Sequence, residues 1–168
     1  QAKEIKIWVE RSTDQDRWIA EFWSDDIFEL TFEPAARIIS LAQQMSREEK
    51  LSLAQAVELY GKLGMAICDA GIAVWNSKYY YNVERPVDYI RRNMDPNWKP
   101  LLNNPIQKFY GMTPEFPAYP SGHSGFAGAG TGILADFFGN NKKFTDYSHH
   151  DRIEFRSDPR VYNQILDI

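Results

Sequence analysis

Several features that would settle the class of this protein at once are scarce. Its 168 residues include one cysteine, three histidines and no excess of basic side chains, and the net charge is −4. The single Cys68 has no partner for an internal disulfide, and its apolar helical setting predicts a packed thiol. The acidic balance argues against a nucleic-acid-binding module, so any anion site must be local.

Long hydrophobic runs are also missing. The longest nearly uncharged stretches, Ala66–Ser77 and Ser121–Ala135, fall short of the roughly 20 apolar residues that span a bilayer. We therefore expect a soluble protein with no membrane span. The chain starts at Gln1 rather than methionine, which is compatible with a removed leader and a periplasmic or cell-envelope precursor. The compartment itself stays open.

What is present predicts one all-α domain covering residues 1–168. The hydrophobic content of 43% and the aromatic content of 14% are typical of a globular chain that can bury a core. Apolar periodicity predicts four helices and capping residues predict a fifth: Thr13–Ser24, Pro34–Met45, Arg47 to about Tyr80, Ser121–Gly139, and a last one beginning at Ser157. Glu4–Glu10 fits a short strand or a frayed helix equally well. Residues 95–120 hold six of the nine prolines and predict an ordered surface excursion.

Two local signals refine these helices. Ser46 followed by Glu49 matches a capping box and predicts the start of the longest helix, whose apolar face carries Leu59 and Leu63. The aromatics of the first helix are expected in the core rather than in a binding site. These are Trp18, Phe22 and Trp23.

The first chemical signal is the stretch from Pro117 to Gly139. Ser121 is a natural helix cap, and Gly139 suits the C-terminal left-handed position. Interior glycines cost roughly 1 kcal/mol each in a helix, so this helix must pack closely against neighbours in a bundle. Its first turn brings together unpaired backbone N–H groups, the hydroxyl of Ser121 and the imidazole of His123. This combination predicts an anion site.

The second signal lies at the end of the long helix, where Lys78 and Arg85 precede Pro86. Two helical turns would place both cations on one side, and the proline frees Arg85 to point inward at a break. Arginine offers a bidentate fork for a tetrahedral oxyanion, and lysine a point charge. Taken alone, the pattern is more typical of solvated or dipole-pairing cations, and that role is the one predicted for Arg91 and Arg92.

Together, Lys-x6-Arg-Pro at Lys78–Pro86 and Pro-Ser-Gly-His at Pro120–His123 resemble the first two signature motifs of the type 2 phosphatidic acid phosphatase and vanadium-dependent haloperoxidase superfamily. The resemblance implies a helical bundle with its core motifs within residues 78–139. It implies that Lys78, Arg85, Ser121 and Gly122 bind phosphate or vanadate and that His123 is the catalytic acid–base group. No metal ion is implied beyond vanadate.

The superfamily's third motif, Ser-Arg-x-x-x-Gly-x-His, is absent from the 168 residues. It supplies a second arginine and the histidine that attacks phosphorus or ligates vanadium. We therefore expect a domain truncated at its C-terminus and inactive by itself, whose exposed edge would favour association between copies. His149 and His150 lack the motif's spacing, so surface or structural roles are expected for them.

Three functions remain open at this stage. The first is a phosphomonoester hydrolase, which needs no cofactor and which we rank slightly higher for that reason. The second is a haloperoxidase that uses vanadate, halide and peroxide. The third is a non-catalytic anion-binding domain.

Overall fold

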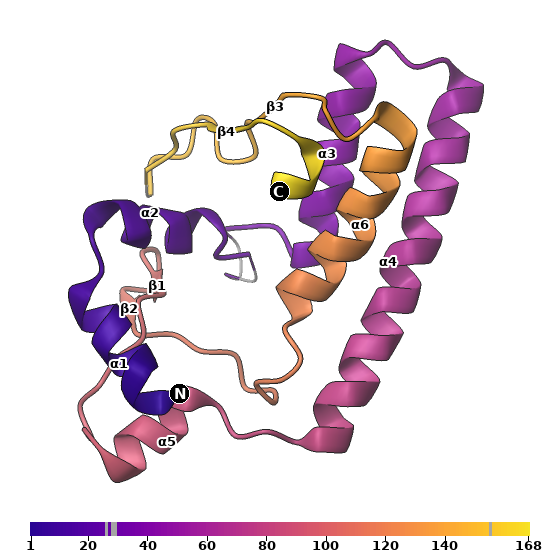
Figure 1. Ribbon diagram of the computed structural model, residues 1–168. Coiled ribbons are helices and arrows are strands. Elements are labelled where there is room, and N and C mark those ends of the chain that lie inside the picture. Colours follow the sequence, from indigo (N-terminus) through magenta and orange to yellow (C-terminus); the bar gives the residue numbers. More distant parts are fainter. Residues whose placement is uncertain (26, 28–29, 155) are drawn as a thin grey trace.

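The computed structural model of the protein describes residues 1–25, 27, 30–154 and 156–168 and consists mainly of helices (Figure 1). Among these residues no helix is long and apolar enough to cross a membrane. The elements in chain order are α1 (Ala2–Arg11), α2 (Asp14–Phe22), α3 (Pro34–Glu48), α4 (Leu53–Tyr81), α5 (Pro86–Asn93), β1 (Asn103–Asn104), β2 (Phe109–Tyr110), α6 (Gly122–Phe138), β3 (Phe144–Asp146), β4 (Arg160–Tyr162) and the 3-10 helix η1 (Ile165–Asp167). The predicted all-α class is confirmed.

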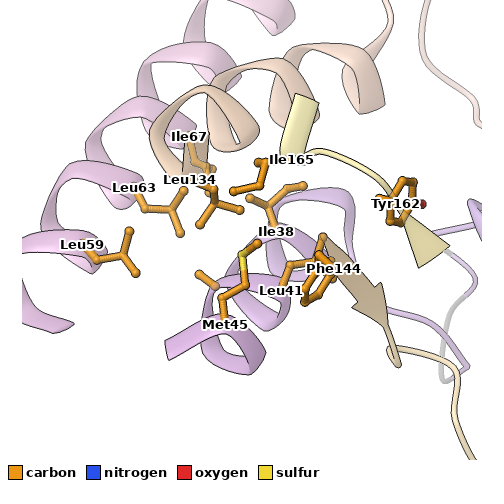
Figure 2. Close-up of a cluster of buried hydrophobic side chains, with 11 residues drawn as sticks. Ile38, Leu41, Met45, Leu59, Leu63, Ile67, Leu134, Phe144, Tyr162 and Ile165 are labelled. Atoms are coloured by element: carbon orange, nitrogen blue, oxygen red, sulfur yellow. The ribbon is translucent and has the colours of Figure 1, made fainter. Parts of the chain in front are cut away.

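Helices α3, α4 and α6 form the bundle that holds the main hydrophobic core (Figure 2). The predicted apolar face of α4 supplies buried Leu59 and Leu63. The other core residues come from α3, α4, α6 and the C-terminal segment: Ile38, Leu41, Ala42, Met45, Ile67, Leu134, Phe144, Tyr162 and Ile165. A smaller cluster, Val87, Ile90 and Trp98, packs against α1 at the other end of the molecule.

The glycines of α6 permit the close packing that the sequence predicts. A Cβ atom added to Gly125 would lie 2.5 Å from Cγ2 of Val74 in α4, and one added to Gly130 would lie 2.2 Å from Cγ2 of Ile38 in α3. Figure 1 shows α6 running beside α4, with α3 on its other side. Two other glycines of this helix, Gly128 and Gly132, have no such neighbour within 4 Å among the described residues.

Two short antiparallel strand pairs complete the fold. β1 pairs with β2, with Asn103 opposite Tyr110, within the proline-rich segment that was predicted to be an ordered excursion. β3 pairs with β4, with Asp146 opposite Arg160. In Figure 1 the C-terminal end returns to α3 and α6, where Ile165 enters the core.

Glu4–Glu10, for which the sequence left strand and helix open, is helical, within α1. Two predicted helix starts were wrong. The capping box is not at Ser46, which lies inside α3 and donates its hydroxyl to the Ala42 carbonyl; Ser52 caps α4 instead, with Gln55 as its partner. No helix begins at Ser157, because β4 and η1 occupy the C-terminal segment.

Two residues also differ from the predictions, Cys68 in its exposure and Gly139 in its backbone angles. Cys68 is exposed rather than packed, since its face of α4 points away from the core. Gly139 ends α6 with a positive φ, but its ψ of 132° lies outside the left-handed helical region.

Candidate functional site

Lys78 lies in the last turn of α4 and is almost completely buried, with 1% of its surface exposed. Its ammonium group donates to the carbonyl oxygens of Pro117 at 2.8 Å and Ala118 at 3.4 Å. Burial, and secondarily the charge of Arg85, lower the pKa of Lys78. The proline-rich loop therefore fixes the side chain in place while its charged form is disfavoured.

Arg85 precedes α5 and adopts an extended backbone, with φ −71° and ψ 141°. Pro86 explains this conformation, because proline disfavours helical geometry in the residue before it. The guanidinium donates from Nε to the Thr113 hydroxyl at 2.7 Å and from Nη1 to the Phe116 carbonyl at 2.9 Å. Burial lowers the pKa of Arg85, but an arginine stays charged.

The aromatic ring of Phe116 lies close to both cations. The Phe116 ring centroid lies 4.9 Å from Nζ of Lys78 and 5.4 Å from Cζ of Arg85. Trp75, one turn before Lys78 on the same helix, lies 5.7 Å from that ammonium and 5.1 Å from Phe116, ring to ring. Cation–π attraction of this kind strengthens when the cation is desolvated.

The N-terminus of α6 contributes the other three predicted residues to the site. The Ser121 hydroxyl accepts a hydrogen bond from the Ser124 N–H at 3.2 Å, as predicted for a helix cap, so its own O–H remains able to donate. Gly122 is the first residue of the helix, and a Cβ there would come within 3.1 Å of the Trp75 ring. Because Gly122 has no side chain, the backbone can approach the Trp75 ring closely.

His123 follows in the first turn of α6, with 42% of its side chain exposed. Its Nε2 atom is buried, however, and has no hydrogen-bond partner among the described residues. The carboxylate of Asp25 lies nearby, with Oδ2 4.0 Å from Nε2. A buried ring nitrogen without a partner requires an explanation, and a bound ligand atom that completes its hydrogen bond would provide one.

A buried ionic network lies behind His123. Arg37 of α3 donates from Nε to both carboxylate oxygens of Asp25, at 2.9 and 2.8 Å, and from Nη1 to Asp146 at 3.0 Å. Its Nη2 contacts the Phe22 carbonyl and Nε2 of His149. Burial raises the pKa of Asp25, although Arg37 and His123 act against this rise.

All five residues predicted for the site line one cavity of about 770 Å³. Lys78 and Arg85 come from the ends of α4 and α5, and Ser121, Gly122 and His123 from the start of α6. The structure therefore brings together groups that lie up to 45 residues apart in the chain. We call this set of five residues the cage.

The remaining histidines lie outside the cage. His149 is buried beside Arg37, and His150 is exposed. These positions agree with the predicted structural and surface roles. Within the described ranges no group of three or more His, Cys, Asp or Glu residues is arranged to hold a metal ion.

Some residues of the site were not predicted. Trp75 precedes Lys78 by three residues, a spacing that puts both on one side of a helix, so the sequence did contain a signal for it. Trp23 packs against the core, as expected, but it is only half-buried and also lines the cavity. Asp25 carries no local signal, because its position depends on a tertiary contact with Arg37.

Comparison with known proteins places this site in a family. Residues 58–164 match the family described as the VCPO second helical-bundle domain. The chain belongs to this vanadium haloperoxidase-like family. The match covers both motifs of the cage and the whole of α6.

Two relatives agree with this assignment. The vanadium chloroperoxidase of Curvularia inaequalis is 32% identical over 103 residues, which is 53% of this chain and 16% of that protein. The crystal structure described as the first bacterial vanadium-dependent iodoperoxidase matches with a TM-score of 0.84 and 28% identity, over 99% of this chain and 39% of that chain. The chain thus spans well under half the length of either relative.

Proposed function

We propose that this chain forms the anion-binding part of a vanadate-dependent haloperoxidase. The observation that carries the proposal is the cage, in which two cations and a helix N-terminus line the same cavity as a partnerless histidine nitrogen. Both relatives are vanadium peroxidases, which supports this function over the phosphomonoester hydrolase that the sequence ranked first. The same cage would suit phosphate, so the two functions must be separated by experiment.

The residues present fit a tetrahedral oxyanion. Arg85 uses Nε and Nη1 in the bonds to Thr113 and Phe116, and no described residue accepts a bond from its Nη2. Lys78 has three N–H donors, of which the loop carbonyls take two. Together with the Ser121 hydroxyl and the Gly122 N–H, these donors would hold the oxygens of vanadate.

When bound, vanadate would supply the Lewis acidity that allows hydrogen peroxide to oxidise a halide. The chain's own residues would set the conditions for that chemistry. Lys78 and Arg85 would neutralise negative charge, and Lys78 would do so from a buried position, where charges act strongly. His123, which lines the cavity, would take up or release a proton at Nε2, the buried ring atom without a hydrogen-bond partner among the described residues.

The binding part of the proposal is tested by titrating orthovanadate into the protein by calorimetry. Arg85→Ala should weaken binding about tenfold or more, because a hydrogen bond to a charged group is worth about 1.5–3 kcal/mol. Arg92→Ala is the matched control, since Arg92 is exposed and pairs with Glu84. Equal affinities for the native chain and Arg85→Ala would refute the cage.

The catalytic part is tested by assaying halide oxidation with a polypeptide that contains this chain together with the superfamily's third motif. We expect bromide or iodide oxidation with vanadate and peroxide, and His123→Ala should slow it about 100-fold or more while orthovanadate still binds. His150→Ala, at an exposed position, should leave the rate unchanged. Hydrolysis of p-nitrophenyl phosphate without any halide oxidation would restore the phosphatase.

A further inference from the structure

Helix α4 carries a second apolar surface that faces away from the core. Leu59, Leu63 and Ile67 mark its buried face, against which α3 and α6 pack. In Figure 1 α4 lies at the right-hand edge of the molecule, with α6 on its inner side. A helix that is apolar on both sides is normally packed on both sides. We call the second surface the outer stripe, and its residues are exposed and follow one another at spacings of three and four: Ala54, Val57, Gly61, Met65, Cys68 and Ile72.

The outer stripe is large for an apolar surface in contact with water. Val57, Met65 and Ile72 each have 65% of their surface exposed, and the exposed Trp75 and Tyr79 continue the stripe toward the end of the helix. Its full length is about 38 Å, and at a helix diameter of about 10–12 Å it covers about 400 Å². Patches of this size on a monomer often mark an interaction site.

Two glycines leave the backbone accessible at the centre of this surface. A Cβ atom added to Gly61 or to Gly64 beside it would meet nothing within 4 Å among the described residues. Each glycine costs roughly 1 kcal/mol relative to alanine inside a helix, and no contact within the described chain requires either one. In α6, Gly125 and Gly130 allow neighbouring helices to approach closely. Gly61 and Gly64 would admit a second helix in the same way.

The charges beside the stripe fit an antiparallel pair of copies. Glu58, Lys62 and Asp69 are exposed on one flank, where Nζ of Lys62 lies 2.6 Å from Oε1 of Glu58. A two-fold axis between antiparallel helices brings the same flank of both copies together, and residues equally far from the axis meet. The midpoint of Lys62 and Asp69 lies within about one residue of the midpoint of the stripe. With the axis there, Lys62 of each copy lies opposite Asp69 of the other, and Met65 lies beside its own copy.

We propose that the outer stripe of α4 is an interface between two copies of this chain, paired antiparallel about a two-fold axis beside Met65. The contact would bury about 800 Å², which is less than most stable interfaces bury, so we expect a dimer that dissociates on dilution. A lipid surface fits the stripe less well. The flanking charges are mainly acidic, whereas helices that lie on membranes carry lysine and arginine there. This inference goes beyond the proposed function and does not depend on what the cage binds.

Sedimentation velocity of the full chain over a series of protein concentrations tests the interface. The native chain should shift from monomer toward dimer as its concentration rises. Met65→Glu should weaken association about tenfold or more, because it places two carboxylates together in an apolar contact. Met65 is exposed, so the fold should persist, which circular dichroism checks. Ala73→Glu is the matched control, because it adds the same charge at an exposed position of α4 outside the stripe and should leave association unchanged.

Exchanging the flanking charges tests the antiparallel direction. Lys62→Glu and Asp69→Lys should each weaken association about threefold or more, since each brings like charges together across the interface. The double variant should return to within about twofold of the native chain, because the two ion pairs form again with their signs reversed. Failure of the double variant to recover would overturn the arrangement.

Other occupants of the stripe give different results. A native chain that stays monomeric, or that associates as strongly as Met65→Glu, would overturn the inference. Binding to phosphatidylcholine vesicles without dimerisation would overturn it as well and assign the stripe to lipid. The same sedimentation series on a polypeptide that contains this chain together with the superfamily's third motif is the last check. Dimerisation that Met65→Glu weakens would support the inference there, and a monomer would overturn it. If Cys68 in that monomer no longer reacted with a maleimide, the stripe would be covered by the polypeptide's own further segments.

Discussion

Lys78 shows how a charged residue can be kept in a nearly dry position. Its four-carbon stem passes through the last turn of α4, and its ammonium group meets two carbonyl oxygens and an aromatic face instead of water. No carboxylate contributes to its lowered pKa, which burial and the nearby Arg85 both favour. A buried cation with neutral neighbours and a second cation close by is stabilised by an anion.

We predict that this cage loses anion affinity at lower pH than an exposed lysine would allow. Because the pKa of Lys78 is lowered from 10.5, its charge disappears as the pH rises through the lowered value, and the attraction for the anion disappears with it. Sulfate is a suitable probe, since its charge is constant through the alkaline range. Calorimetric titrations at increasing pH should show the fall in the native chain, while Lys78→Arg, which stays charged, should bind sulfate to higher pH. Identical pH courses would contradict the role of Lys78.

The sequence predicts the cage residues but misses the residues that support them. The helix start at Ser121–His123 indicates an anion site by itself, whereas Lys78 and Arg85 join it only through the resemblance to the superfamily's motifs. The residues that support the cage, Arg37 and Asp25, show no characteristic spacing in the sequence. A buried ion pair brings its partners together from distant elements, and neither partner carries a local pattern that distinguishes it from a solvated charge.

At the scale of the elements, the start of α4 depends on which of two serines caps the helix, and the sequence does not decide between them. Both Ser46 and Ser52 are followed three residues later by a Glu or Gln that can complete a capping box. In the structure Ser52 is the cap. The Ser52 hydroxyl accepts a hydrogen bond from the Gln55 N–H at 3.3 Å, and the Ser52 backbone N–H donates to the Gln55 side chain at 3.0 Å. Ser46 instead remains helical, because α3 continues the core face through Met45.

The choice of cap is testable by two alanine substitutions. Ser52→Ala should lower the free energy of unfolding by about 0.5–2 kcal/mol, since it removes the bonds that satisfy the first turn of α4. Ser46→Ala should cost little, because alanine is a better helix former than serine and the lost bond only returns to the helix's own backbone. Urea unfolding monitored by circular dichroism measures both. A larger loss for Ser46→Ala would mean that α4 begins where the sequence first suggested.

The glycines of α6 offer a second pair of matched substitutions. Gly130→Ala would place a methyl group 2.2 Å from Cγ2 of Ile38, so we expect a net loss of about 1–3 kcal/mol from overpacking. Gly128→Ala meets open space and should stabilise the protein by up to about 1 kcal/mol through helix propensity alone. Thermal unfolding at equal protein concentration distinguishes them. Equal shifts in the two variants would show that α6 does not approach α3 as described.

The element-scale prediction from sequence succeeds where one physical effect dominates. The apolar periodicity of α4 and the glycine pattern of α6 each require burial against a neighbouring helix. In the structure these two helices pack against each other. The C-terminal segment fails for the opposite reason. Ser157 and Pro159 resemble a helix start, but the following strand pairs with β3 and carries Tyr162 into the core. Tertiary burial therefore overrides the local signal.

At the scale of the whole molecule, one buried arginine joins segments that are far apart in the chain. Arg37 of α3 contacts Phe22 at the end of α2 and Asp25 three residues later. It also contacts Asp146 and His149 in the C-terminal region. Asp25 also lies against His123 of the cage. The position of the catalytic candidate thus depends on a network that closes only when both ends of the chain are folded around α3.

This network makes the stability of the protein depend on pH through His149. Burial first, and the charge of Arg37 second, lower the pKa of His149 from 6.5 to about 4, while the Phe22 carbonyl and Asp146 act in the opposite direction. Between these two pH values the unfolded chain binds a proton that the folded chain excludes. Stability therefore falls as the pH drops from about 6.5 to about 4, by at most about 3 kcal/mol.

Urea unfolding at pH 7 and at pH 4.5 measures this contribution when the native chain is compared with His149→Gln. The variant should be less stable at pH 7, because a residue of the network is lost, but it should lose less stability on acidification than the native chain. The comparison isolates His149 from Asp25, whose raised pKa favours the folded state as the pH falls and is present in both proteins. His150→Gln, at an exposed position, should follow the native pH dependence. Parallel losses in the native chain and His149→Gln would assign the acid sensitivity to other groups and remove His149 from the coupling between the cage and the C-terminal segment.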